Sequence, residues 1–181
     1  MIAALDVQYA EDGATAIAAA VVFQNWTDEA PLAEYAAVCE RIQSYVPGEF
    51  YKRELPCLLA VLERVSQPLE AIIIDGYVLL GDKPGLGMRL WEAMDRKRPI
   101  IGVAKTHFRG AAAAEVWRGQ TRIPLYVTAA GTNVTQAATN VARMAGSFRV
   151  PTMLKRVDRL ARDPLRAAND PVVLEGMSPK P

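Results

Sequence analysis

The chain has 181 residues, of which 51% are hydrophobic and 23% charged, and its formal net charge at pH 7 is +1. This length and composition fit one compact domain with an ample core. No apolar run is long enough to span a membrane and no secretory signal pattern opens the chain, so we expect a cytoplasmic protein without a membrane partner.

The two cysteines, Cys39 and Cys57, lie in apolar contexts and lack the spacing of metal ligands. We expect both to be buried free thiols, because cytosolic proteins rarely form disulfides.

The first forty residues predict three strands joined by short turns. The strands cover residues 1–9, 15–24 and 32–38, and turn residues stand at 12–13 and 25–28. Strands with such short connections indicate an antiparallel meander.

The rest of the chain alternates helices with strands. Leucines at i, i+3 and i+4 spacing predict a helix over 54–65, with Pro56 in its first turn. Further helices are expected at 86–96, 134–145 and 153–162, and strands at 71–74, 99–104 and 123–128. The fold class is therefore α/β, with a mixed sheet of three antiparallel and then parallel strands, and helices on both faces. We expect one domain over 1–165 and a loose, proline-rich tail over 166–181.

Three acidic residues stand out by their positions. Asp75 ends the buried run AIII, Asp6 lies inside an apolar strand, and Glu54 begins a helix. Asp75 either caps a turn or binds a cation, and Glu54 could simply favour the first turn of its helix. If the two strands are neighbours, all three carboxylates meet at one edge of the sheet, where ligand sites in α/β proteins gather. Clustered oxygens without His or Cys suit Mg²⁺ or Mn²⁺.

Basic residues are concentrated in two segments. Such runs are either solvated helix faces or surfaces that follow phosphates. One set is Arg96, Lys97, Arg98, Lys105 and Arg109, and the other is Arg143, Arg149, Lys155, Arg156, Arg159, Arg162 and Arg166.

Six motifs occur in order along the chain: LDVQY at 5–9, YVPGEFYKRELPCLLAVL at 45–62, IIIDG at 72–76, GLG at 85–87, GVAK at 102–105 and PLYVTAAG at 124–131. Together they closely resemble the endonuclease V family. The resemblance implies a ribonuclease-H-like fold and a Mg²⁺-dependent endonuclease, with Mn²⁺ as a substitute, of a kind that serves DNA repair. Its substrate would be DNA or RNA containing a deaminated base, chiefly inosine, cut one nucleotide beyond that base. Nothing in the sequence indicates an oligomer.

The resemblance also assigns roles to residues. The family's metal-binding carboxylates fall on Asp6, Glu54 and Asp75, and its catalytic lysine falls on Lys105, where a cation can hold the scissile phosphate. The loop that pries a base from its stack falls on Tyr45, Val46, Pro47 and Gly48. The wall of the base pocket falls on Gly48, Phe50, Gly76 and Gly87, since small residues let backbone approach a purine.

Four features depart from the family pattern. The chain starts at the first strand, without the usual preceding helical segment. Val78 replaces a glycine and the loop at 79–83 is altered, so we expect a branched side chain where the base should sit. The late Pro-Gly-His motif reads Ala130-Gly131-Thr132, followed by Asn133 in place of arginine. Thr132 cannot carry a proton at neutral pH as imidazole does.

The only histidine, His107, either swings toward the site or is an exposed loop residue. The sequence therefore predicts an inosine-directed endonuclease. The alternatives are a nuclease with another substrate and a catalytically weak nucleic-acid-binding paralogue. The retained acids argue against a pure binder, because buried carboxylates are costly without a compensating charge.

Overall fold

The computed structural model describes residues 1–11, 13–40, 42, 49–163 and 172–173. The predicted base-prying loop at 45–48 and the predicted tail, apart from residues 172–173, lie outside these ranges. No helix in the described ranges combines the length and apolar character that crossing a membrane requires.

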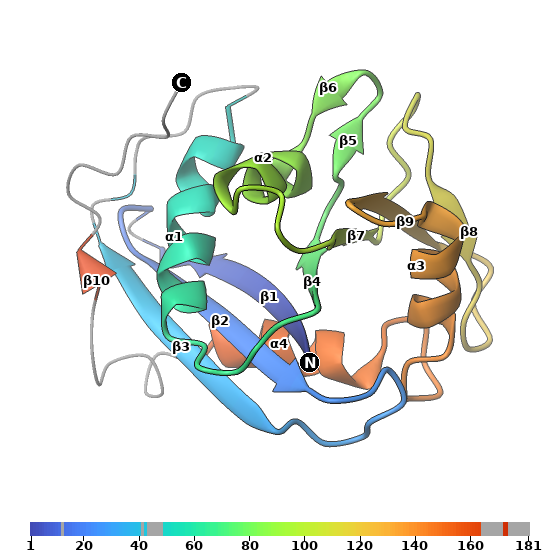
Figure 1. The fold of residues 1–181 in the computed structure, drawn as a ribbon, viewed down its shortest axis with the longest axis horizontal. Helices are drawn as coiled ribbons and strands as arrows, with labels where there is room; N and C mark the ends of the chain where they lie inside the picture. Colours follow the sequence, from blue (N-terminus) through green and yellow to red (C-terminus); the bar gives the residue numbers. More distant parts are fainter. Residues whose placement is uncertain (12, 41, 43–48, 164–171, 174–181) are drawn as a thin grey trace.

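One mixed sheet runs through the molecule (Figure 1). Its described strands follow the order β10-β3-β2-β1-β4-β7-β9-β8. In chain order they are β1 (Ile2–Tyr9), β2 (Ala16–Phe23), β3 (Ala33–Glu40), β4 (Ala71–Asp75), β7 (Ile100–Ala104), β8 (Ala114–Val116), β9 (Leu125–Ala130) and β10 (Val172–Val173). A separate small hairpin consists of β5 (Leu79–Leu80) and β6 (Lys83–Pro84).

The strand directions confirm the expected fold class. β1, β2 and β3 form an antiparallel meander, and β4 and β7 run parallel to β1. The last long strand, β9, runs antiparallel to β7, and β8 runs antiparallel to β9. No crossover helix stands between β7 and β9 in the chain, so the connection can reverse direction. β8 was not predicted, because its alanine-rich segment lacks apolar alternation.

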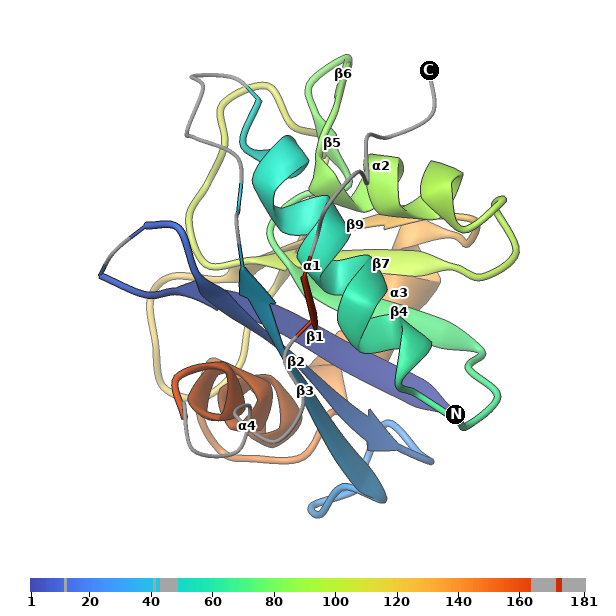
Figure 2. The same cartoon turned by 90° about the vertical axis from the view of Figure 1, so that its left-hand side faces the viewer.

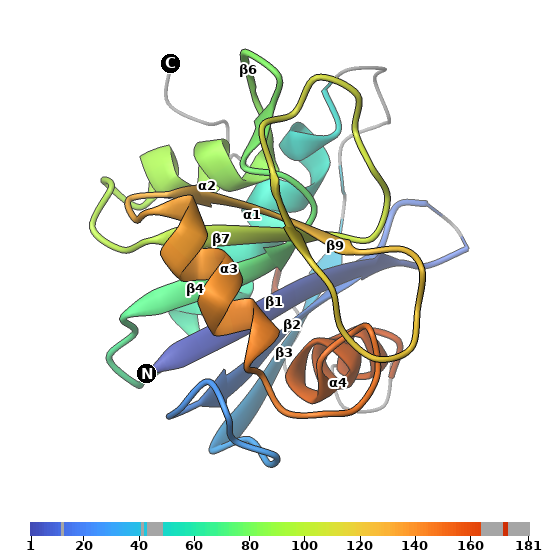
Figure 3. The same ribbon diagram turned by 90° about the vertical axis from the view of Figure 1, so that its right-hand side faces the viewer.

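Helices cover both faces of the sheet (Figures 2 and 3). α1 (Tyr51–Glu63) and α2 (Leu86–Ala93) pack on one face, and α3 (Val134–Ala142) and α4 (Thr152–Ala161) pack on the other. Successive side chains of β1 therefore enter different cores: Ala3 and Leu5 face α1, while Ile2 and Ala4 face α4. This double burial explains the continuous apolar runs of the central strands.

The start of α1 differs from the sequence prediction, and the state of the cysteines agrees with it. α1 begins at Tyr51 rather than residue 54, so Pro56 lies in its second turn. Because proline has no amide N–H, the carbonyl of Lys52 receives no helical hydrogen bond from residue 56. Both cysteines are free and buried, as predicted.

The C-terminal end of α3 is held by a buried side chain. The guanidinium of Arg118, a residue only 8% exposed, donates to the carbonyls of Val141 at 3.2 Å, Ala142, Ala145 at 3.3 Å and Gly146 at 2.8 Å. Val141 and Ala142 are the last residues of α3, where carbonyls lack the i+4 amide partners of the helix interior, and Ala145 and Gly146 belong to the segment that follows.

Candidate active site

The register of the sheet brings Asp6 and Asp75 together. Leu5 of β1 pairs with Ile74 of β4 in parallel register, so Asp6 in the middle of β1 and Asp75 at the carboxyl end of β4 follow a matched pair on neighbouring strands. Side chains alternate along a strand, and Ala4 and Ile73 both face the α4 side. Asp6 and Asp75 therefore share that side of the sheet.

A cavity of about 350 Å³ opens at this edge. Glu54 reaches it from the first turn of α1, on the opposite face from α4. The three carboxylates that the sequence singled out thus line one space from three different elements. The residues that line the cavity are Leu5, Asp6, Val7, Gln8, Phe50, Glu54, Leu58, Ile74, Asp75, Leu86, Lys105, Asp158 and Arg162.

Two of the carboxylates hold protons more tightly than usual. Burial, followed by the charge of Asp75, raises the pKa of Asp6 to about 6, although the Val7 amide donates to its Oδ1 at 3.0 Å. Burial, followed by the charges of Asp6 and Asp75, raises the pKa of Glu54 to about 8. Both shifts follow from negative charge confined away from water.

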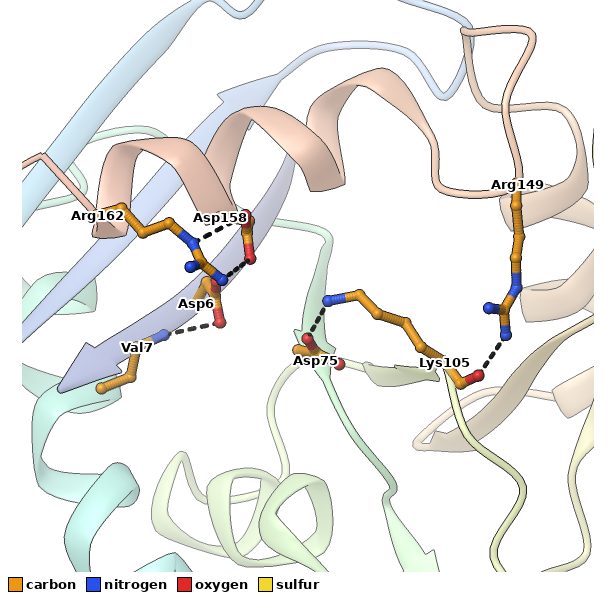
Figure 4. A network of polar contacts seen from close by, with 7 residues as sticks. All are labelled: Asp6, Val7, Asp75, Lys105, Arg149, Asp158 and Arg162. Carbon is orange, nitrogen blue, oxygen red and sulfur yellow. Dashed lines mark hydrogen bonds and ion pairs between the residues drawn. The ribbon is translucent and has the colours of Figure 1, made fainter.

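Lys105 supplies a cation directly after β7. Its ammonium lies 2.6 Å from Oδ2 of Asp75 (Figure 4). Its carbonyl accepts a hydrogen bond from the guanidinium of Arg149, which also donates to the carbonyl of Pro124 at 2.7 Å. The lysine backbone is thereby fixed, while the side chain, 46% exposed, remains open to a ligand.

α4 brings a fourth acid that sequence reasoning missed. Asp158 lines the cavity and raises the pKa of Asp6, after the larger effects of burial and Asp75. Its oxygens pair with Nε and Nη2 of Arg162, each at 3.2 Å (Figure 4). In the sequence, Asp158 is recognisable only as an acid close to the apolar Val157 and Leu160 in a helix that is otherwise basic. Nothing local in the sequence places that helix against β1.

The donor set fits a hard divalent cation. Among the described residues no three acidic, cysteine or histidine side chains are gathered tightly enough to form a closed metal site. The carboxylates nevertheless surround one cavity, where the charge of Asp75 contributes to the raised pKa values of both Asp6 and Glu54. Oxygen ligands under mutual repulsion are the chemistry that Mg²⁺ or Mn²⁺ relieves.

The predicted base-pocket residues have different surroundings. Phe50 lines the cavity and is 44% exposed, with its ring centroid 6.0 Å from that of Tyr9. Gly76 adopts a φ of +112°, and no heavy atom lies within 4 Å of the position that a Cβ would take. Gly87 is buried, and a Cβ there would meet Val78 at 2.8 Å, so packing already requires its small size.

The residues of the two altered motifs lie outside the acidic cavity. Val78 is fully buried in the core beneath α2, and its amide donates to Oγ1 of Thr128 at 2.8 Å, so its side chain does not enter the cavity. Thr132 follows the end of β9, where Ala130 pairs with Ile100 at the start of β7. Asp75 pairs with Val103, near the other end of β7. Thr132 therefore lies at the opposite end of the sheet from the acids.

His107 is an exposed residue, as the second interpretation expected. Its ring centroid lies 5.1 Å from that of Tyr126, and it is not among the described residues that line the cavity.

The comparison with known proteins decides the family. Residues 1–144 match the sequence model of endonuclease V. The chain belongs to the endonuclease V family. Endonuclease V of Streptomyces avermitilis is 30% identical over 186 residues, which cover 91% of this chain and 80% of that protein. Endonuclease V of Streptomyces coelicolor is 33% identical over an alignment that covers 91% of this chain and 78% of that protein. These homologues indicate a nuclease that acts on nucleic acid.

Solved structures of the family confirm the ribonuclease-H-like fold. The Streptomyces avermitilis enzyme superposes with a TM-score of 0.73 at 26% identity, over 89% of this chain and 79% of that one. A second solved structure is endonuclease V of Ciona intestinalis in complex with a 24mer DNA containing an inosine followed by a ribo-adenosine. It superposes with a TM-score of 0.75 over 91% of this chain and 84% of that one. At 16% identity that second likeness shows the fold alone.

Proposed function

We propose that this endonuclease V family member is a divalent-cation-dependent enzyme that hydrolyses a phosphodiester 3′ to a deaminated base, chiefly inosine, in DNA or RNA. The observation that carries the proposal is the acidic cavity beside the middle of β1 and the carboxyl end of β4, with a lysine at its rim. Family membership supplies the substrate class.

Asp6, Glu54 and Asp75 would hold the cation, with Asp158 beside them. When bound, Mg²⁺ or Mn²⁺ supplies a Lewis acid for the phosphate and neutralises the carboxylates. Lys105 pairs with Asp75 in the structure, and its ammonium can turn to an oxygen of the scissile phosphate. A fixed cation there offsets the charge that develops as the bond breaks.

Phe50 and Gly76 are the described residues best placed to receive the base. Phe50 presents an exposed aromatic surface at the cavity, and open space lies beside Gly76 where a planar ring can approach the backbone. A base taken out of its stack needs such surfaces. The loop at 45–48, outside the described residues, is the proposed wedge on grounds of the family motif alone.

The test is a cleavage assay on matched DNA and RNA oligonucleotides, with and without a single inosine, in Mg²⁺ and in Mn²⁺. Asp75→Asn is the inactive variant. Asp95→Asn is its control, because Asp95 is an exposed acid beyond α2 whose positive φ suits asparagine. The proposal expects metal-dependent cuts 3′ to inosine by the wild type and by Asp95→Asn, and none by Asp75→Asn.

Other outcomes identify the alternatives. Equal cutting of strands with and without inosine would indicate a nuclease with another specificity. Binding of strands and metal without any cut would indicate a non-catalytic paralogue. Equal activity of Asp75→Asn and the wild type would remove the acidic cavity from the chemistry.

A further inference from the structure

The outer face of α4 carries a row of cations. Lys155, Arg159 and Arg162 are separated by four and three residues, so they lie on one side of the helix. The apolar residues of α4 are on its other side and buried: Met153, Val157, Leu160 and Ala161. At 1.5 Å per residue, the row extends about 10 Å along the helix axis.

The row leads to the cavity at one end. Arg162 lines the cavity, where its guanidinium pairs with Asp158. Figure 4 shows Arg162 and Asp158 projecting from α4 toward the same space as Asp6 and Asp75. A strand that leaves the cavity along α4 would therefore meet cations continuously.

An exposed aromatic ring stands at the other end of the row. Phe148 is 65% exposed, more than any other large hydrophobic residue in the described ranges. The ammonium of Lys155 lies 3.6 Å from its ring centroid. That contact places a positive charge against the ring and leaves most of the residue open to solvent. Such a pairing of aromatic surface and cation is typical of surfaces that stack unpaired bases.

The backbone beside Phe148 is tied to the backbone of Lys105. Arg149, the next residue, donates to the carbonyl of Lys105 and to that of Pro124. A Cβ on Gly119 would lie 3.0 Å from the Arg149 amide nitrogen, so the backbone on both sides of Phe148 is closely packed. The backbone that carries the aromatic ring is therefore closely packed.

We propose that Phe148, Lys155, Arg159 and Arg162 form a track that binds the nucleic-acid strand on one side of the cleaved phosphodiester, with a base stacked on Phe148. This inference rests on the proposed function and adds a second contact region outside the cavity. The charge around the ring favours nucleic acid over protein as the partner. The ammonium of Lys155 lies against the ring, so a polyanionic strand complements this surface, whereas an apolar protein surface does not. A rise of 3.4 Å per nucleotide within a duplex strand places about three nucleotides along the row.

The test is fluorescence anisotropy with labelled single-stranded oligonucleotides in EDTA, where binding is measured without cleavage. Each strand carries one inosine, and strands are shortened on the 5′ or the 3′ side of it. Phe148→Leu keeps an apolar side chain but removes the aromatic face. We expect it to weaken binding of the full-length strand about fivefold or more. Phe148→Trp restores affinity, and shortening one of the two arms abolishes the difference between Phe148→Leu and the wild type.

The cations have a separate signature. Arg159→Ala should lower the slope of log Kd against log salt by about 0.7, the value for one phosphate contact on a single strand. Phe148→Leu should leave that slope unchanged. Lys97→Ala is the matched control, because Lys97 is an exposed cation paired with Asp95 beyond α2. It should change neither affinity nor slope.

Three results would overturn the track. Wild-type affinity in Phe148→Leu would exclude stacking, and an unchanged salt slope in Arg159→Ala would exclude the row of cations. In either case, retained inosine cleavage would leave the proposed function standing. If the wild type binds no strand of either kind, the track and the proposed function fail together.

Discussion

Binding of a divalent cation in the acidic cavity should depend strongly on pH between 6 and 8. Carboxylates ligate metal in their ionised form, so protons on Asp6 and Glu54 compete with the cation. The pKa of Asp6 is about 6 and that of Glu54 about 8, both above their ordinary values. Raising the pH therefore strengthens binding, and lowering it weakens binding.

The magnitude follows from the two pKa values. At pH 6 about half of Asp6 and about one in a hundred of Glu54 are ionised, so about one molecule in 200 carries both charges. At pH 8 nearly all Asp6 and about half of Glu54 are ionised, so about one molecule in two does. The affinity for Mn²⁺ should therefore rise about 100-fold, which corresponds to about 2.7 kcal/mol.

Calorimetric titration with Mn²⁺ at pH 6, 7 and 8 measures this directly. Repeating it in two buffers with different ionisation enthalpies counts the protons released. Glu54→Gln should bind more weakly at pH 8, and its affinity should change only about twofold across the range, because Asp6 alone remains to titrate. An affinity of the wild type that changes less than about threefold, without proton release, would refute the reasoning.

Three further changes test the stability of the fold and of the site. Arg118→Ala should destabilise the protein by about 3 kcal/mol, measured by urea unfolding, because the carbonyls at the end of α3 lose a buried cationic donor; an effect below about 1 kcal/mol would contradict that role. Val78→Ala should cost about 2 kcal/mol and leave the preference for inosine unchanged, whereas the exposed Leu79→Ala should cost less than about 0.5 kcal/mol. Glu54 has a raised pKa in the folded state, so its protonated carboxyl favours folding. This contribution to the free energy of unfolding is complete below pH 4.5 and is lost as the pH rises through about 8. In EDTA, Glu54→Gln should therefore melt above the wild type at pH 8.5 but not at pH 5, and a lower melting temperature at pH 8.5 would contradict the raised pKa.

The central strands and the acid triad could be predicted because their signals are local. The run IIIDG identifies a doubly buried strand ending in a carboxylate, and an acid inside the apolar β1 strand requires a partner. Once β1 and β4 are parallel neighbours, their register brings the two aspartates together. The contribution of Glu54 followed from its place in the first turn of a leucine-rich helix.

Asp158 could not be predicted in the same way. It enters the cavity because α4 folds back against β1, more than 140 residues earlier in the chain, and the charge pattern of α4 indicates only a basic surface helix. The position of Thr132 has a related cause, because the reversed direction of β9 carries its end away from the acids. The burial of Val78 could not be predicted either, because a glycine-to-valine change does not reveal which face of the loop is buried.

The most direct measurement is anomalous diffraction at the manganese edge, from crystals of the wild type grown with Mn²⁺ and an inosine-containing oligonucleotide. The central claim is that Asp6, Glu54 and Asp75 hold the cation that cleavage requires. An anomalous peak among these three carboxylates, lost in Asp75→Asn, is the predicted result. An empty cavity at a Mn²⁺ concentration that supports cleavage, or a peak only elsewhere, would contradict the claim.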